Sequence, residues 1–164
     1  MDPQQEGRSA RPNRAEKATV IHQDRSAGRL ARAKPSVTVI VDTSVWIEFF
    51  RGEEEYHAAL MPLIEQGRVL ALECVFGELI QGARDERERN LLERFWDALP
   101  KTEIPRLFVV AGKHSSIEQY PKKGVGLIDA AIVAAARQVK AQVWSLDKKL
   151  NAILTSSERF SPST

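Results

Sequence analysis

Short runs of β-branched and apolar residues alternate along the chain with longer stretches in which apolar residues recur every three or four positions. The short runs predict strands buried on both faces, and the longer stretches predict amphipathic helices. Strands that alternate with helices form a parallel sheet with helices on both faces, so we expect an α/β domain. The expected strands cover residues 37–41, 69–72 and 143–145. The expected helices cover residues 45–50, 53–66, 74–83, 85–99, 106–120, 127–139 and 148–153.

Four acidic residues stand in or beside these apolar segments. An ionised carboxylate is costly to bury without a partner, so four in such places suggest one partner that they share. Sites in open parallel sheets lie beyond the carboxyl ends of the strands, and the crossovers can bring all four residues there. A hard divalent cation such as Mg²⁺ or Mn²⁺ suits several carboxylates. The four residues are Asp42, Glu78, Asp129 and Asp147.

A cluster of carboxylates of this kind predicts chemistry on phosphates. Crowded like charges repel, and one or two divalent cations remove that repulsion. Such ions can activate a water molecule and stabilise the leaving oxygen of a phosphodiester. Thr43 and Ser44, directly after the first acid, could hydrogen-bond a ligated water or a phosphate. The residues alone therefore indicate a metal-dependent enzyme.

Each acid also has an ordinary structural explanation. Asp42 could cap the helix that follows it, and Asp129 could favour the start of its own helix. Asp147 could be a turn residue before two lysines. Glu78 could be an exposed helix residue. The four signals are weak singly and much stronger together.

Composition favours one globular domain. The chain has 164 residues, of which 43% are hydrophobic, and this length is enough to bury a core. The apolar run around Asp129 is too short to cross a bilayer, so no membrane partner is expected. No apolar region of a secretory signal follows the basic N-terminus, and the single Cys74 cannot form an internal disulfide. We expect a cytoplasmic protein in which Cys74 is a small core residue.

Charge divides the chain near residue 36. Residues 1–36 hold eight basic and four acidic residues, a formal charge of +4, whereas the remainder carries −2. The basic segment lacks a periodic apolar pattern, which predicts a disordered extension at 1–35. A basic tail could also touch nucleic acid. The expected catalytic domain covers 36–155, and a C-terminal tail covers 156–164.

From about Ser36 to Ile153 the chain resembles the PIN domain, and most closely the VapC-type toxins of bacterial toxin–antitoxin pairs. Residues 41–47, Val-Asp-Thr-Ser-Val-Trp-Ile, are similar to the first acid motif of that family, and residues 78–82, Glu-Leu-Ile-Gln-Gly, to its Glu-x-x-x-Gly helix. Residues 126–129, Gly-Leu-Ile-Asp, resemble the third motif, and residues 145–147, Ser-Leu-Asp, resemble the last. Each motif is loose, but their order and spacing together are specific.

The resemblance implies a PIN-like three-layer sandwich and an endoribonuclease that depends on Mg²⁺ or Mn²⁺. It also implies a homodimer, a tRNA or rRNA substrate, and a VapB-type antitoxin whose C-terminal segment covers the site. Contact with operator DNA would come only through the antitoxin complex. Many relatives have a further acid two residues after the last Asp, where Lys149 stands here, so the second metal position departs from the family pattern. By match, the metal ligands are Asp42, Glu78, Asp129 and Asp147, with Ser44 in a supporting role.

Other functions remain open at this point. A PIN nuclease of RNA maturation would carry the same acids, and a small antitoxin reading frame next door would favour the toxin. A non-catalytic PIN module that binds RNA or a protein would gain nothing from a repulsive cluster of acids. A phosphatase of the haloacid dehalogenase type needs an Asp where Ser44 stands. A receiver domain needs paired acids before its first helix, and that pair is missing.

An antitoxin that covers the acids needs an apolar groove for an amphipathic helix. We expect that groove to be bordered by the helices at 45–50 and 53–66, which are rich in aromatic residues. The alternative is that these aromatic residues fill the core. The residues in question are Trp46, Phe49, Phe50 and Tyr56.

Overall fold

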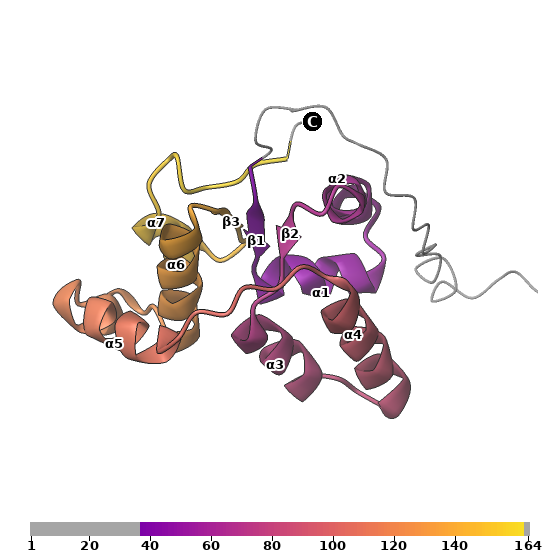
Figure 1. Cartoon of the computed structure of the whole chain (residues 1–164), viewed down its shortest axis with the longest axis horizontal. Coiled ribbons are helices and arrows are strands. Elements are labelled where there is room, and N and C mark those ends of the chain that lie inside the picture. The colour runs from indigo at the N-terminus through magenta and orange to yellow at the C-terminus, as the bar shows by residue number, and fades with distance from the viewer. Residues whose placement is uncertain (1–36, 163–164) are drawn as a thin grey trace, which may run out of the picture. The chain divides into compact units, whose positions relative to one another are not determined.

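The computed structural model describes residues 37–162, so the basic extension expected at 1–35 lies outside the described residues. Within the described range, strands and helices alternate as the apolar pattern predicts (Figure 1). The elements are β1 (Val39–Val41), α1 (Thr43–Arg51), α2 (Glu54–Glu65), β2 (Val69–Leu70), α3 (Glu73–Gln81), α4 (Glu86–Ala98), α5 (Leu107–Ile117), the 3₁₀ helix η2 (Tyr120–Lys123), α6 (Leu127–Val139), β3 (Gln142–Trp144) and α7 (Lys148–Ile153).

The three strands form an all-parallel sheet in the order β2-β1-β3, with β1 in the centre. Val39 pairs with both Val69 and Gln142, and Val41 pairs with Trp144. All three residues of β1 are buried, because α5, α6 and α7 lie to one side of the strands and α1 and α2 to the other (Figure 1). The expected α/β fold with a central parallel sheet is confirmed.

The chain after Leu154 continues along the edge of the sheet. The amide of Val143 donates to the carbonyl of Glu158 at 2.7 Å, and the amide of Phe160 donates to the carbonyl of Val143 at 2.8 Å. These bonds form a single parallel bridge between Val143 and Arg159. Part of the segment assigned to a tail from the sequence therefore pairs with β3.

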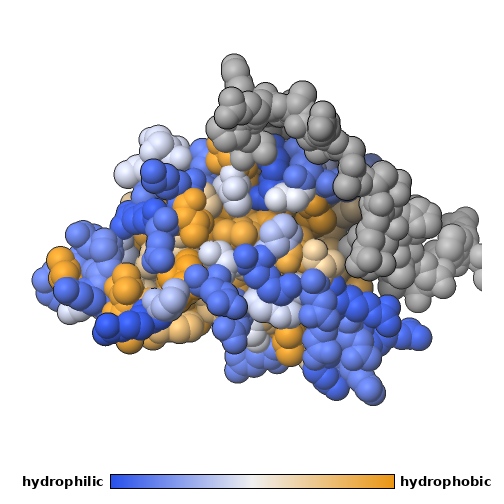
Figure 2. Space-filling model, viewed as in Figure 1, coloured by the Kyte–Doolittle hydropathy of each residue, from blue (hydrophilic) through white to orange (hydrophobic). Residues whose placement is uncertain are grey.

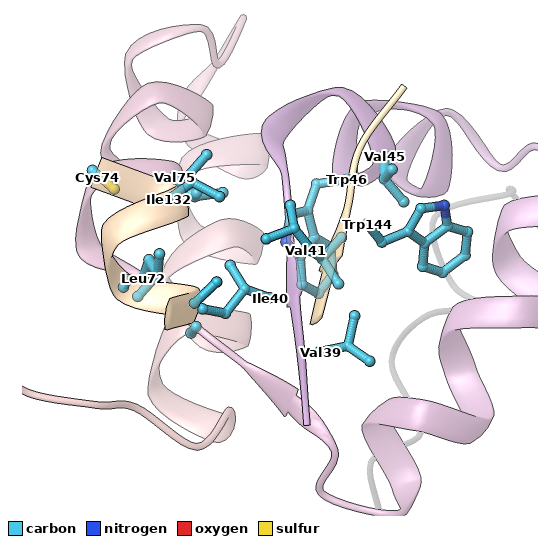
Figure 3. Packing of buried hydrophobic residues seen from close by; sticks show 14 of the residues in the cluster. Val39, Ile40, Val41, Val45, Trp46, Leu72, Cys74, Val75, Ile132 and Trp144 are labelled. Carbon is cyan, nitrogen blue, oxygen red and sulfur yellow. The ribbon is translucent and has the colours of Figure 1, made fainter. Parts of the chain in front are cut away.

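An aromatic cluster fills the space between α1, α3 and α4. Trp46 is 1% exposed and Phe49 is 3% exposed, and the ring centroids of both lie within about 6 Å of Phe95. Trp46 belongs to the same buried cluster as the residues of β1 (Figure 3). Edge-to-face pairs of this kind add about 0.5–1.5 kcal/mol beyond the area that they bury. Trp46 and Phe49 thus form core, while Phe50 and Tyr56 remain half-buried.

The alanine-rich helix α6 packs closely against the rest of the domain. Ala131 and Ala135 are fully buried, because their small side chains allow the backbone of α6 to approach its neighbours. The helix has 13 residues, so it is too short to cross a bilayer. No other helix between residues 37 and 162 has the length and apolar character of a membrane span.

Cys74, at the start of α3, is a buried core residue as the sequence predicts. Burial raises the pKa of its thiol to about 11, so the thiol is neutral near pH 7. A neutral, buried thiol is a poor nucleophile and a poor metal ligand. Cys74 therefore takes no part in the chemistry argued below.

Candidate active site

Asp42 follows the central strand and is 6% exposed. Its amide donates to the carbonyl of Trp144 at 2.9 Å, which fixes its backbone to β3. Its Oδ2 accepts the hydroxyl protons of Ser44 at 2.6 Å and Ser145 at 2.7 Å. Oδ1 of Asp42 has no hydrogen-bond partner among the described residues. No side-chain nitrogen or oxygen between residues 37 and 162 is both fully buried and without a partner, so Oδ1 is not fully buried. Oδ1 is therefore not closed off from solvent, so it can meet a ligand.

Two serine hydroxyls connect Asp42 to the loop after β3. The hydroxyl of Ser145 accepts the amide of Asp147 at 3.0 Å while it donates to Asp42, and the hydroxyl of Ser44 accepts the amide of Leu146 at 3.0 Å. The side-chain amide of Asn151 then donates to the carbonyls of Ser145 at 2.8 Å and Asp147 at 2.9 Å. Ser44 thus orients Asp42 through a hydrogen bond, and its supporting role in catalysis stays a prediction.

Ser145 belongs to the candidate site through its bond to Asp42, although its sequence motif indicated no separate role for it. It stood inside the last motif, but its contact with Asp42 spans 103 positions and depends on β3 lying next to β1. The available signal was a hydroxyl directly after a strand that ends beside Asp42. Only the strand order turns that signal into a contact.

Asp147 begins α7 and is exposed. Its Oδ1 accepts the amides of Lys149 at 2.6 Å and Leu150 at 3.2 Å. Its second oxygen has no partner among the described residues. Ser145 joins its backbone to the carboxylate of Asp42.

Asp129 lies in the first turn of α6 and is half-buried, and its Oδ2 accepts the amide of Gly126 at 2.9 Å. Burial raises the pKa of its carboxyl above the usual range, and the charges of Asp42 and Asp147 raise it further. The ammonium group of Lys149 acts in the opposite direction. The charges of Asp42 and Asp147 therefore both interact with the carboxylate of Asp129 at this edge of the sheet.

Glu78 takes a different position from the three aspartates. It is exposed on α3, and its Oε2 accepts the hydroxyl proton of Thr43 at 2.8 Å. Thr43 adjoins Asp42, so Glu78 reaches the same edge from the other side. Its charge is not among the causes that raise the pKa of Asp129. A shared role for Glu78 with the other acids stays a prediction.

Comparison with known proteins places this arrangement in a family. The family model described as "PIN domain" matches residues 39–153 of the sequence. The chain belongs to the PIN domain family. A protein named VapC ribonuclease Mb1587, from Mycobacterium bovis, is 24% identical to this PIN domain over 121 residues, which are 70% of this chain and 90% of that protein.

Solved structures share the PIN fold. A chain of the VapBC2 complex from Rickettsia felis, bound to a DNA fragment from its promoter, has a TM-score of 0.57 and 19% identity, over 71% of this chain and 92% of that one. VapC20 of Mycobacterium tuberculosis, described as a Sarcin-Ricin loop cleaving toxin, also has a TM-score of 0.57. It is 18% identical to this chain, and the match covers 74% of this chain and 99% of VapC20. These likenesses confirm the PIN-like sandwich predicted from the sequence.

In this PIN domain, three of the acids also start helices, as the structural explanations supposed. Asp42 caps α1, Asp147 caps α7, and Asp129 closes the first turn of α6. Each cap bond uses one carboxylate oxygen. A cap and a ligand are therefore compatible roles for the same side chain, with one oxygen serving each.

The donor set fits a hard cation. Between residues 37 and 162, no three His, Cys, Asp or Glu side chains stand close enough to form a ready-made cage. Mg²⁺ does not need one, because it keeps several waters and binds through one or two carboxylates plus substrate phosphates. Asp42, Asp129 and Asp147 offer oxygen atoms of this kind and repel one another without a counter-ion. The residues therefore suit Mg²⁺ or Mn²⁺.

Proposed function

We propose that this PIN domain is a metal-dependent endoribonuclease and the toxin of a VapBC-type pair. The observation that carries the proposal is that Ser145 links the carboxylate of Asp42 to the backbone of Asp147, and that the charges of both aspartates act on Asp129. A related protein named VapC ribonuclease and a structural neighbour described as a Sarcin-Ricin loop cleaving toxin support RNA as the substrate, either tRNA or rRNA.

In this proposal Asp42, Asp129 and Asp147, with Glu78 as the fourth acid, hold Mg²⁺ or Mn²⁺. When bound, the ion activates water and offsets charge on the leaving oxygen of a phosphodiester. The chain's own groups supply the geometry. Ser44 and Ser145 fix Oδ2 of Asp42, so that Oδ1 keeps one direction.

A cleavage assay tests the nuclease proposal. The full chain should cut a susceptible RNA with Mg²⁺ or Mn²⁺ and stop with EDTA. RNA ends sequenced after a short induction should identify the cleaved RNA, with Asp42→Asn as the control. Undiminished cleavage in EDTA would contradict the metal mechanism.

A groove beside the acids suits an antitoxin helix. The hollow, about 330 Å³, lies between α1, α3 and α4, so α2 does not border it as the sequence suggested. Its apolar lining includes Ile47, Phe50, Leu79 and Leu92. Glu78 lies at the same groove and reaches Thr43 beside Asp42. An amphipathic helix seated there can direct a basic residue toward the acids.

Co-expression with the product of a neighbouring reading frame tests this part of the proposal. The partner should co-purify and relieve the growth defect that the PIN domain causes alone. The structural neighbour from Rickettsia felis is itself a VapBC complex, which supports such a partner. If no neighbouring product binds and expression does not slow growth, a nuclease of RNA maturation replaces the toxin.

An apolar face on α5 suits a homodimer. Phe108, Val109, Val110 and Ile117 are between 45% and 67% exposed, and Leu127 at the start of α6 is 51% exposed. Figure 2 shows apolar residues, in orange, on the surface around α5. A two-fold dimer would bury this face against its own copy. Val109→Glu should convert a dimer to a monomer in light scattering, whereas Glu118→Gln should not.

The remaining parts of the proposal concern the rest of the chain. Residues 36–155 carry catalysis, and the extension at 1–35 is dispensable for it. A chain that starts at Ser36 should cut RNA at the rate of the full chain. Operator DNA is contacted only through the antitoxin complex, and the protein acts on RNA in the cytoplasm.

A further inference from the structure

A second hollow, about 580 Å³, is lined by residues of α5, η2, α6 and α7. Figure 1 shows α5, α6 and α7 together on one side of the strands. We call this hollow the basic cleft. The acidic Glu118 is outnumbered there by cations, so the cleft carries a strong positive charge. Its charged lining consists of His114, Lys123, Arg137, Lys148, Lys149 and Glu118.

One wall of the basic cleft is fixed by an ion pair. The guanidinium of Arg137 donates to Glu158 through Nε at 2.7 Å and through Nη2 at 3.4 Å. Its Nη1 lies 3.2 Å from Nε2 of His114. Glu158 comes from the segment that pairs with β3, so the C-terminal segment holds this wall in place. The pair partly neutralises Arg137, which leaves the lysines as the main unneutralised charge.

The three lysines of the cleft have no acidic partner in the part of the chain that the structure describes. Lys123 lies over the ring of Tyr120, with Nζ 5.6 Å from the ring centroid, and neither Lys148 nor Lys149 forms an ion pair between residues 37 and 162. Unpaired cations gathered in a concave surface attract an anion more strongly than the same cations scattered on a convex one. The basic cleft is therefore prepared for an anionic ligand.

Lys149 stands where the basic cleft meets the acids. Its side chain crosses Gly124, where a methyl group would lie 3.1 Å from Nζ and 3.3 Å from Cδ. The backbone amide of Lys149 donates to Oδ1 of Asp147 at 2.6 Å, so Lys149 adjoins the acids directly. Asp147 caps α7 and Lys148 and Lys149 are its first residues, so the first turn of α7 joins the acids to the basic cleft.

We propose that the basic cleft binds the backbone phosphates of an RNA strand next to the bond that is cut. The inference rests on the proposed function, because the acids locate that bond. Lys123 and Lys148 contact neighbouring phosphates, and Lys149 contacts the phosphate nearest the acids. An acidic peptide of an antitoxin is the competing occupant. The continuity between the basic cleft and the acids favours the substrate, since a strand cut at the acids must extend past them.

RNA binding without cleavage tests the inference. A fluorescent single-stranded RNA is titrated with the full chain in EDTA, and anisotropy is followed at several salt concentrations. Lys123→Gln with Lys148→Gln should weaken binding roughly tenfold at low salt and reduce the salt slope by about 1.4, as expected for two lost phosphate contacts on a single strand. The matched control is Arg89→Gln with Arg94→Gln on α4, which removes the same charge far from the cleft. This control should change affinity less than twofold.

The outcomes separate the inference from the proposed function. Equal losses in the two double variants would mean general attraction and would overturn the cleft inference. RNA binding kept in the cleft variant, together with lost binding of the co-expressed antitoxin, would assign the cleft to an acidic peptide and also overturn it. If RNA binding depends on the cleft but the wild type cuts no RNA with Mg²⁺ or Mn²⁺, the cleft binds RNA as inferred, whereas the nuclease proposal and the placement of a cut bond beside the cleft both fail.

Discussion

The apolar groove includes Glu78 and Thr43, which adjoins Asp42, whereas the basic cleft adjoins Asp147 through Lys148 and Lys149, and the two linings differ in kind. The groove combines apolar residues with a rim of two arginines and two glutamates, Arg51, Arg84, Glu78 and Glu88. The basic cleft has one acid against four Lys and Arg side chains. An apolar floor with a balanced rim suits a helix of a protein partner, whereas uncompensated cations suit phosphates. In the proposed function, substrate and antitoxin would therefore approach the acids along separate surfaces.

The largest expected effect comes from the centre that both surfaces share. Asp42→Asn should lower RNA cleavage about 100-fold or more, because even residues that only support a metal ligand cost 10- to 100-fold when changed. Asn keeps a side-chain oxygen for the hydroxyls of Ser44 and Ser145, so thermal unfolding should move little. Asp97→Asn on α4 is the control and should cut RNA normally. Asn caps a helix as well as Asp does, so undiminished cleavage by Asp42→Asn would show that Asp42 serves only as a cap.

The second effect separates the two surfaces. Ile47, 38% exposed in the groove, can be changed to Glu. The new charge beside Glu78 and Glu88 should weaken antitoxin binding roughly 100-fold, or about 2.7 kcal/mol, as at an interface hot spot. Cleavage by the free protein should not change. Binding is measured by calorimetry with the co-expressed partner.

The Lys123→Gln and Lys148→Gln double variant should show the reverse pattern, with weaker RNA binding and normal antitoxin binding. Ile47→Val serves as the control for the groove, since it keeps an apolar side chain. If Ile47→Glu weakened RNA and antitoxin alike, the two surfaces would not be separate.

Local patterns were enough to predict the elements, but not their ends. The strand expected to begin at Val37 begins at Val39, because Val37 is 43% exposed and lies before the first paired residue. The helix expected at 106–120 ends at Ile117, since Gln119 adopts a left-handed conformation with φ of 54° and a 3₁₀ turn follows. Apolar spacing fixes which face of an element is buried, whereas ends depend on single residues.

The acids proposed for the site could be singled out in the sequence, whereas their surroundings could not. Each acid stood beside an apolar segment, which is a local signal. The bond from Ser145 to Asp42 needed the strand order, and the basic cleft gathers Lys123, Arg137 and Lys149 from three separate elements. In the sequence, these cations are spaced like ordinary surface residues. Only tertiary structure shows that they share one cleft.

A smaller effect is expected at the wall of the basic cleft. The hydrogen bond from Arg137 lowers the pKa of Glu158 to about 2. The folded protein therefore stabilises the ionised carboxylate of Glu158 more than the unfolded chain does. This stabilisation is present above the ordinary Glu pKa of about 4.3 and is lost as the pH falls toward 2. Glu158→Gln should therefore cost about 1 kcal/mol at pH 7 and almost nothing near pH 2.

Urea unfolding at several pH values measures the loss. The same variant should bind RNA slightly more tightly at low salt, because an anion at the basic cleft is removed, and antitoxin binding in the groove should not change. Glu93→Gln, an exposed residue on α4, is the control. A stability difference that does not depend on pH would contradict the ion pair as its cause.

The smallest effect concerns the cost of gathering the acids between the two surfaces. Burial, with the charges of Asp42 and Asp147, raises the pKa of Asp129, so ionising it costs more in the folded protein than in the unfolded chain. This cost is absent below the ordinary Asp pKa of about 3.9 and grows as the pH rises through the folded value. Asp129→Asn keeps an oxygen for the amide of Gly126 and removes the charge. The metal-free variant should therefore be more stable than the wild type at pH 7, by less than about 1 kcal/mol after solvent screening, and equal to it near pH 3.

Chemical unfolding in EDTA at pH 3 and pH 7 measures this difference in stability. With Mg²⁺ in place of EDTA at pH 7, Asp129→Asn should instead be less stable than the wild type. A bound cation stabilises the folded wild type in proportion to its affinity, and the variant has lost one of the ligands. Asp97→Asn should show neither effect. If Asp129→Asn were less stable than the wild type in EDTA at pH 7, Asp129 would act as a helix cap without a crowding cost. The case for three aspartates that share one cation would then lose its electrostatic support.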